Sequence, residues 1–315
     1  MSGKNANLQK AKRTRNDEFF TRLIDIEKEL IYYKEHFRNK IVYCNCDDPT
    51  RSAFWMYFHQ NFTELGLIKL ISTHYSSEES TYKMEYAGGN DYNIESGEKT
   101  PLMGNGDFSS QECLDILDEC DIVATNPPFS LFKNYVPVLI AHQKKFLIVG
   151  NKNAVTYREI FPLFKENKVW TGCTNIREFM QPDGSIKKFG NVGWFTNLDV
   201  EKRHEKLILW KDYTPEEYLK YDNYDAINVN KVSEIPYGYD GVMGVPITFL
   251  DKYNPEDFEI VGTDEAEGVG LSNGLYISNS KYKQCYVNGK RIYKRIFIKI
   301  RGEYPCLYRQ QDKSL

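Results

Sequence analysis

The sequence predicts an α/β fold in which helices cover both faces of a doubly wound, mostly parallel sheet. Strand-like and helix-like segments alternate between residues 41 and 166, as expected for parallel strands joined by helical crossovers. The tetrapeptide Asn126-Pro-Pro-Phe129 directly follows one strand-like run. Beyond Trp170 the alternation stops, and short strand-like runs separated by turns take its place. We therefore expect a regular core followed by a less regular region.

The first expected element is an amphipathic helix over about residues 17–37. Its apolar residues Ile26, Leu30, Tyr33 and Phe37 recur at spacings of four, three and four, which places them on one face. Residues 1–16 precede this helix and carry lysines and arginines without any acidic residue. This segment is expected to form a basic arm.

The alternating elements follow in order along the chain. We expect strands at 41–44, 67–73, 122–125 and 146–149, and helices at about 52–61, 110–119 and 156–166. Ser130 is expected to cap a further helix. The stretch 76–106, rich in Gly, Ser, Glu and Tyr, is expected to be irregular.

The second half of the chain has weaker signals. Residues 193–197 and 245–250 resemble strands, and Asn288-Gly289 joins two strand-like runs in a predicted hairpin. In the second arm of that hairpin the alternation places basic and aromatic residues on one face and isoleucines on the other. The first face comprises Arg291, Tyr293, Arg295, Phe297, Lys299 and Arg301.

Composition narrows the class of protein. With 41% hydrophobic residues the chain can bury a substantial core. No apolar run approaches the length of a membrane span, and the first fifteen residues lack the apolar stretch of a secretory signal. The seven cysteines are scattered and odd in number, which predicts a reduced, cytoplasmic protein. Cys44-x-Cys46 has no matching second pair, so no metal site is expected.

Charge is unevenly distributed although the net charge is only −3. Residues 1–16 carry +5, and residues 281–315 carry +8, while the body between them is acidic. Basic ends of this kind suit a protein that contacts phosphates. Solvated tails have the same composition, so the charge pattern alone favours neither interpretation.

The strongest chemical signal is the Asn126-Pro127-Pro128-Phe129 loop. Ligands of parallel sheets bind beyond the carboxyl ends of the strands, where this loop is expected. Two prolines remove N–H donors and leave carbonyl and amide oxygens as acceptors. Such acceptors can hold an aromatic amino group, whose nitrogen is otherwise a poor nucleophile, while Phe129 stacks on the ring. The loop therefore indicates methyl transfer to an aromatic amine, although a rigid turn after a strand is the alternative.

Several longer strings give a more specific indication. They are Asp17-Glu-Phe-Phe-Thr21, Tyr43-Cys-Asn-Cys-Asp-Asp-Pro49, Asn126-Pro-Pro-Phe-Ser-Leu-Phe132, Thr196-Asn-Leu-Asp-Val200, Tyr221-Asp-Asn-Tyr-Asp-Ala-Ile-Asn-Val-Asn230 and Gly241-Val-Met-Gly-Val-Pro-Ile-Thr-Phe-Leu250. With these strings the chain resembles the EcoRI-type family of adenine-N6 DNA methyltransferases over most of its length. The resemblance implies a class I, Rossmann-like methyltransferase fold with S-adenosylmethionine as the methyl donor, which becomes S-adenosylhomocysteine.

The resemblance also implies a set of donor-binding residues. They are Phe20, Thr21, Asn45, Asp47, Asp48, Asp107, Phe108 and Asn126. Local readings remain open for some of them: Asp48-Pro49 is also typical of a turn, and Asp107 of a helix cap. The usual glycine-rich turn after the first strand is absent, and Asp47-Asp48 stands in its place. The ribose-binding acid expected after the second strand is also missing.

The substrate implied by the resemblance is double-stranded DNA, with the target adenine flipped into the pocket. We expect phosphate contacts from Lys12, Arg13, Arg15, Arg291, Arg295 and Lys299. The expected organisation is a basic arm at 1–16, a donor-binding catalytic core at 17–170, and a region at 171–315 that combines remaining core strands with target recognition. A separate restriction endonuclease is a possible functional partner.

Two alternatives are compatible with parts of the sequence. An Asn-Pro-Pro-aromatic loop also serves methyltransferases that act on RNA adenine or protein glutamine, but these do not explain the longer strings. The absent glycine-rich turn and ribose acid would also fit a degenerate domain that only binds DNA. The intact Asn126–Phe129 loop argues against that interpretation, because a pure binding module has no need for it.

Overall fold

The computed structural model describes residues 20–77, 80–181, 183–264, 270–277 and 283–302. The chain divides into two compact units. Unit 1 comprises residues 1–152 and 172–198, and unit 2 comprises residues 153–171 and 199–315. The chain therefore leaves unit 1, returns to it for two strands and leaves it again.

Unit 1 is built on a nine-stranded sheet with the order β1-β8-β9-β7-β6-β2-β3-β4-β5. Strands β7, β6, β2 and β3 pair in parallel, and the strands on either side are antiparallel. The strands are β1 Phe20–Thr21, β2 Ile41–Cys44, β3 Lys69–His74, β4 Tyr82–Tyr86, β5 Glu98–Pro101, β6 Ile122–Thr125, β7 Lys145–Asn151, β8 Trp170–Met180 and β9 Ile186–Thr196. The parallel centre confirms the predicted α/β class.

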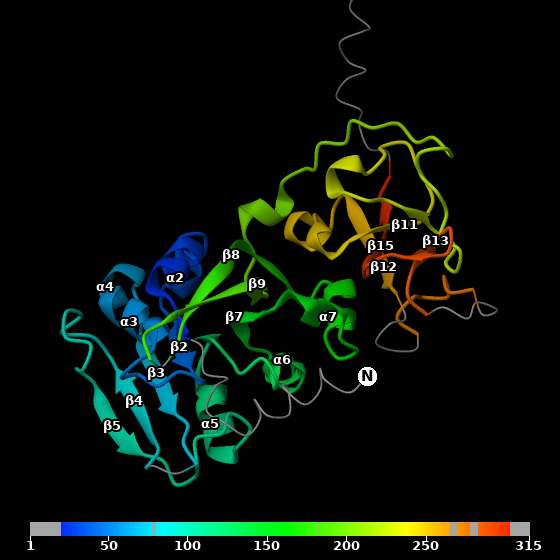
Figure 1. The fold of residues 1–315 in the computed structure, drawn as a ribbon. Coiled ribbons are helices and arrows are strands. Elements are labelled where there is room, and N and C mark those ends of the chain that lie inside the picture. Colours follow the sequence, from blue (N-terminus) through cyan, green and yellow to red (C-terminus); the bar gives the residue numbers. More distant parts are fainter. Residues whose placement is uncertain (1–19, 78–79, 182, 265–269, 278–282, 303–315) are drawn as a thin grey trace, which may run out of the picture. The chain divides into compact units, whose positions relative to one another are not determined.

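Helices cover both faces of this sheet, with α2, α3 and α4 on one side and α5 and α6 on the other (Figure 1). Their bounds are α2 Leu23–Leu30, α3 Ala53–Gln60, α4 Phe62–Leu65, α5 Gln111–Glu119 and α6 Phe132–Ala141, with the 3₁₀ turn η1 Lys34–Phe37. The 3₁₀ turn η2, Lys152–Thr156, starts at the last residue before the chain enters unit 2. Ser52 and Ser110 cap α3 and α5 through their hydroxyls. The capping residue of α6 is Leu131, so the predicted cap at Ser130 is wrong.

The N-terminal segment differs from its prediction at both ends, since α2 ends at Leu30 and the 3₁₀ turn η1 follows at Lys34–Phe37. Ile26, Leu30, Tyr33 and Phe37 are fully buried, which confirms the predicted apolar face. The helix begins only at Leu23, however, because Phe20–Thr21 pairs with β8 as a short strand. The stretch 76–106 is also more regular than expected, since β4 and β5 extend the sheet as antiparallel strands.

Unit 2 contains a four-stranded sheet with the order β10-β11-β15-β12 and a separate hairpin, β13-β14. Its elements are α7 Phe161–Lys165, η3 Glu201–His204, β10 Ile227–Asn228, η4 Val232–Glu234, β11 Met243–Pro246, η5 Ile247–Lys252, β12 Phe258–Thr263, β13 Tyr286–Val287, β14 Lys290–Arg291 and β15 Arg295–Ile300. The Asn288-Gly289 hairpin is confirmed, with positive φ at both turn residues.

The long string at 221–230 organises the interior of unit 2. Tyr221, Tyr224 and Phe297 pack in one apolar cluster. The Asn223 side chain donates to the carbonyl of Gln284 at 2.5 Å and accepts from the Tyr286 N–H at 3.1 Å. This string therefore fixes the approach to the β13-β14 hairpin.

Candidate active site

The Asn126–Phe129 loop lies at the carboxyl end of β6, in the parallel centre of the unit 1 sheet. Strand β6 pairs with β2 on one side and β7 on the other, and its four residues are buried. After the strand, Pro127 is buried while Pro128 is exposed. The Leu131 N–H donates to the Pro128 carbonyl at 2.9 Å, so the loop turns directly into helix α6. The predicted position at a strand end is confirmed.

Aromatic side chains connect this loop to the N-terminal strand. The Phe129 ring lies edge-on to that of Phe179, with centroids 6.3 Å apart, and Phe179 in turn contacts Phe189 at 5.4 Å. Phe179 is the register partner of Thr21 in the β1–β8 pair. The structure thus brings Phe20 and Thr21, which are predicted to bind the methyl donor, close to the Asn126–Phe129 loop. Phe179 was missed from the sequence because nothing near it resembles a motif.

The turn after β2 is linked to the same loop through Asp47. The Asp47 Oδ2 atom accepts hydrogen bonds from the Thr125 hydroxyl and from the Asn126 N–H, the latter at 3.2 Å. Its Oδ1 atom accepts from the Ser52 hydroxyl at 2.8 Å. Burial raises the pKa of the Asp47 carboxyl, and these three hydrogen bonds lower it only in part. The carboxylate therefore joins the ends of two neighbouring parallel strands.

Asp48 faces a different set of groups. Its Oδ1 atom accepts from the Thr50 N–H at 3.0 Å, the Thr50 hydroxyl at 2.8 Å and the Tyr82 hydroxyl at 3.1 Å. Its Oδ2 atom lies 3.5 Å from His74 Nδ1. This carboxylate closes the turn expected for Asp48-Pro49 and ties it to β3 and β4. A role for Asp48 in donor binding stays a prediction.

Two of the remaining predicted donor residues, Asn45 and Phe108, contact Tyr135 of helix α6. The Tyr135 hydroxyl donates to Asn45 Oδ1, and the Tyr135 ring meets the edge of Phe108 with centroids 5.0 Å apart. Asp107 precedes Phe108, and its Oδ1 atom accepts from the N–H and hydroxyl of Ser109 at 2.8 and 2.6 Å. The structure therefore places Asn45 and Phe108 against one buried tyrosine that the sequence interpretation did not identify.

The predicted phosphate contacts are in different environments. Lys12, Arg13 and Arg15 lie outside the described residues. In unit 2, Arg291 is exposed, Lys299 is half-buried and lies opposite Glu259, and Arg295 is only 7% exposed. The expected continuous basic face from Arg291 to Arg301 is wrong, because β14 ends at Arg291 and residues 295–298 of the central strand β15 are all buried.

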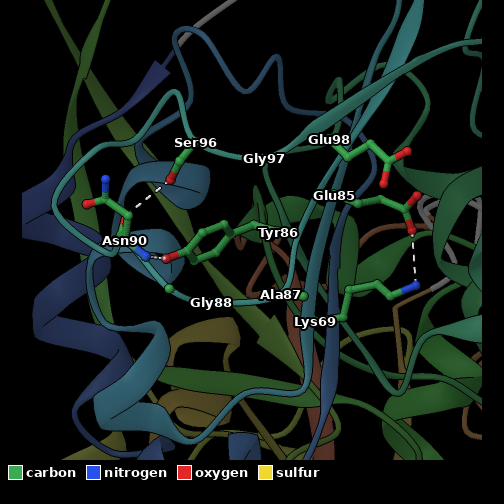
Figure 2. Close-up of a pocket in the computed structure, with 10 residues that line it drawn as sticks. Lys69, Glu85, Tyr86, Ala87, Gly88, Asn90, Ser96, Gly97 and Glu98 are labelled. Atoms are coloured by element: carbon green, nitrogen blue, oxygen red, sulfur yellow. Dashed lines mark hydrogen bonds and ion pairs between the residues drawn. The ribbon is translucent and has the colours of Figure 1, made fainter.

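A separate cavity of about 350 Å³ lies along β3, β4 and the loop that joins β4 to β5. Figure 2 shows that polar groups lining the cavity bind one another: Lys69 Nζ is 3.1 Å from Glu85 Oε1, and the Tyr86 hydroxyl accepts from the main-chain N–H of Asn90 at 2.8 Å. None of the predicted site residues lines it. The cavity therefore adds nothing to the chemistry at Asn126.

Within the described ranges, no group of three or more His, Cys, Asp or Glu side chains is placed to hold a metal ion. The cysteines of those ranges, Cys44 and Cys46 included, are free thiols. No helix in the same part of the chain is long and apolar enough to cross a membrane.

The model of the adenine-specific methyltransferase EcoRI family matches residues 7–301. The chain belongs to this family. It is 44% identical to the Type II methyltransferase M.EcoRI of Escherichia coli, with 93% of this chain and 95% of that protein covered. No solved structure matches the chain.

Two mycoplasma proteins extend the EcoRI family comparison. The chain is 38% identical to the Type II methyltransferase M.MgeORF184P of Mycoplasma genitalium, over 92% of this chain and 97% of that protein. It is 37% identical to the Type II methyltransferase M.MpnI of Mycoplasma pneumoniae, over 93% and 97%. Membership of the EcoRI family confirms the resemblance inferred from the strings, and it implies a methyl donor for this chain.

Proposed function

We propose that the chain transfers a methyl group from S-adenosylmethionine to the N6 amino group of an adenine flipped out of duplex DNA. The observation that carries this proposal is the Asn126–Phe129 loop at the end of β6, directly beside the turn after β2 and the Thr21 segment. Neighbouring strand ends of a parallel sheet are where a donor and an acceptor can meet. The names of the EcoRI relatives support DNA as the substrate.

The residues present fit the methyl donor. Thr21 Oγ1 is buried and finds no hydrogen-bond partner among the described residues. A buried hydroxyl without a partner is costly, so a ligand at this site would relieve it. We assign Phe20 and Thr21 to the methionine end, Asp107 to the amino group of the donor's adenine ring, and Phe108 to the face of that ring. When bound, the donor supplies an electrophilic methyl group on a sulfonium.

The chain itself prepares the acceptor. Asn126 Oδ1 and the Pro127 carbonyl would accept the two N–H bonds of the adenine amino group, which favours a more tetrahedral and more nucleophilic nitrogen. Phe129 would stack on the flipped base, in the manner of other enzymes that act on extruded bases. Much of the rate then comes from orientation of the nitrogen towards the methyl group.

Contacts to DNA are assigned to the arm at 1–16 and to unit 2. Lys12, Arg13 and Arg15, with Arg291 and Lys299 of unit 2, are proposed to neutralise phosphates. We propose that unit 2 contains the surfaces that read the recognition sequence. The Type II names of the relatives also motivate the proposal that a companion endonuclease cuts the sequence that this enzyme protects.

The test compares Asn126→Ala with Asn134→Ala, which makes the same chemical change at an exposed position of helix α6. We expect Asn126→Ala to lower the single-turnover rate of methyl transfer to duplex DNA by at least about 10²-fold, the effect of removing one oriented polar group from an active site. DNA affinity should persist, and Asn134→Ala should match the wild type. Near-normal turnover in Asn126→Ala would overturn the proposed role of the loop.

A further inference from the structure

We propose that Asp47 is a positioning residue for methyl transfer: its carboxylate holds the Asn126–Phe129 loop in its reactive geometry and does not bind the donor. The inference rests on the proposed function. It differs from the expectation that Asp47 contacts the donor, which came from family resemblance. It also assigns a role to Asp47, which stands where the usual glycine-rich turn is absent.

The Asp47 carboxylate is hydrogen-bonded directly to the end of β6 and the start of the loop. Asp47 Oδ2 accepts from the Asn126 N–H at 3.2 Å and from the Thr125 hydroxyl. Thr125 Oγ1 in turn accepts from the Cys46 N–H at 3.2 Å, so the two strand ends are joined in both directions. Asn126 carries the amide proposed to bind the adenine amino group, and Asp47 therefore acts on that amide through the main chain of the same residue.

Asp47 is itself held in place by two serine hydroxyls, those of Ser52 and Ser72. Ser52 donates to Asp47 Oδ1 at 2.8 Å while its oxygen accepts from the N–H groups of Phe54 and Trp55 at 3.0 and 3.3 Å. The main-chain carbonyl of Asp47 accepts from the Ser72 hydroxyl of β3. Both carboxylate oxygens thus have protein partners, and the turn is fixed from α3 and from β3. A rigid turn of this kind can transmit its position to the loop.

The hydrogen bonds to Asp47 depend on the ionisation of its carboxyl group. The ionised carboxylate accepts hydrogen bonds at both oxygens, whereas a protonated carboxyl would present a donor to groups that already donate. Burial raises the pKa of Asp47. The titratable groups around it are the Asp48 carboxyl and the Cys44 and Cys46 thiols, and burial also raises the pKa of both thiols. We therefore expect the rate to fall as pH decreases through the raised pKa of Asp47.

The chain offers a matched control at the opposite end of the same two strands. Asp121 precedes β6, and its Oδ2 atom accepts from the Ile41 N–H at the start of β2 at 2.9 Å. Asp121 therefore also bridges β2 and β6 through a main-chain hydrogen bond, but at their amino ends. Asp121→Asn reproduces the loss of a bridging carboxylate without a change at the Asn126 loop.

The experiment measures single-turnover methylation of duplex DNA, donor affinity by calorimetry and thermal unfolding for Asp47→Asn and Asp121→Asn. We expect Asp47→Asn to lower the rate by about 10²-fold, as displacement of reacting groups by about 1 Å can do. Donor affinity should change by less than about threefold, because the substitution is expected to disturb the position of the loop in the transition state and not the binding of the donor. The rate of Asp121→Asn should stay near that of the wild type, and Asp47→Asn should lose the acidic limb of the pH–rate profile.

Two results would overturn the inference. Parallel loss of donor affinity and rate in Asp47→Asn would identify Asp47 as a donor ligand, and an unchanged rate would remove its positioning role. Thr125→Val provides a second test if Asp47→Asn does not fold, since it removes one hydrogen bond to Oδ2 and should lower the rate without loss of donor affinity. An inactive wild type would instead count against the proposed function, so the two failures are distinguishable.

Discussion

The Glu29 carboxylate joins helix α2 to strand β8 by accepting two hydrogen bonds from Thr174, at 2.7 Å from its N–H and 2.6 Å from its hydroxyl. The second oxygen accepts from the Cys173 N–H at 2.6 Å and the Tyr33 hydroxyl at 3.0 Å. Glu29 is fully buried. Strand β8 also pairs with β1, which contains Thr21. The Glu29 carboxylate therefore holds in place the strand on which the proposed donor-binding residues Phe20 and Thr21 are paired.

Glu29→Gln should destabilise unit 1 although it preserves size. A carboxamide has one oxygen, so its NH₂ group would face N–H or O–H donors that lose their acceptor. Each such buried group costs about 1–3 kcal/mol. Denaturant unfolding should show this loss, and Glu27→Gln, at an exposed position of α2, should show almost none. Equal stability of the two variants would contradict the structural role of Glu29.

The same carboxyl predicts a pH dependence of stability. Burial raises the folded-state pKa of Glu29 above its ordinary value of 4.5, and hydrogen bonds from residues 173 and 174 and from Tyr33 offset this only in part. The folded protein therefore binds this proton more tightly than the unfolded chain, and stability is lost as pH rises from about the ordinary value through the raised one. The difference in unfolding free energy between the wild type and Glu29→Gln should narrow over this interval. A difference that widens would show that the pKa is lowered.

Donor affinity should depend on the charge of Asp107. Asp107→Asn keeps an oxygen for the Ser109 turn but removes the carboxylate proposed to accept from the donor's amino group. We expect a loss of about tenfold in affinity, equivalent to about 1.4 kcal/mol. Asp115→Asn, an exposed position on the adjacent helix α5, is the control. Calorimetry with S-adenosylmethionine would refute the contact if both variants bound alike.

Arg291 and Arg295 should behave differently although both were predicted to bind phosphates. Arg295 is buried, with Nη1 donating to the Tyr293 carbonyl at 2.9 Å, so Arg295→Ala should lower the stability of unit 2 by about 1–3 kcal/mol. Arg291 is exposed, so Arg291→Ala should reduce the salt dependence of DNA binding by about one unit of slope. If a stable Arg295→Ala variant showed a reduced salt dependence of DNA binding, Arg295 would be a phosphate contact and not a structural residue.

Strong local patterns made the centre of the fold predictable. The apolar spacing of Ile26, Leu30 and Tyr33 and the strand directly before Asn126 both correspond to buried elements. Strand β1 was not predictable because its two residues become a strand only by pairing with β8, more than 150 residues away in the sequence. Strand β5, Glu-Lys-Thr-Pro, has no apolar alternation to predict it, whereas β4, Tyr-Lys-Met-Glu-Tyr, alternates apolar and charged residues and could have been predicted from that period of two.

The candidate site was predictable where a motif carried it. Asn126 could be named from a local string and Phe108 from the family resemblance, whereas Phe179 and Tyr135 enter the site through tertiary contacts that no spacing reveals. The basic face failed for a related reason: alternation assigns Arg295 to a side of a strand but cannot tell that both sides of that strand are covered.

Methyl transfer to adenine in DNA is best tested by identifying the methylated product. The wild type would be incubated with labelled S-adenosylmethionine and, in parallel, duplex DNA, RNA and protein, followed by digestion and mass spectrometry of the nucleosides and amino acids. We expect N6-methyladenine in the duplex DNA, at one recognition sequence, and none in the Asn126→Ala reaction. Label found only in RNA or in glutamine, or on cytosine in the duplex, would contradict it.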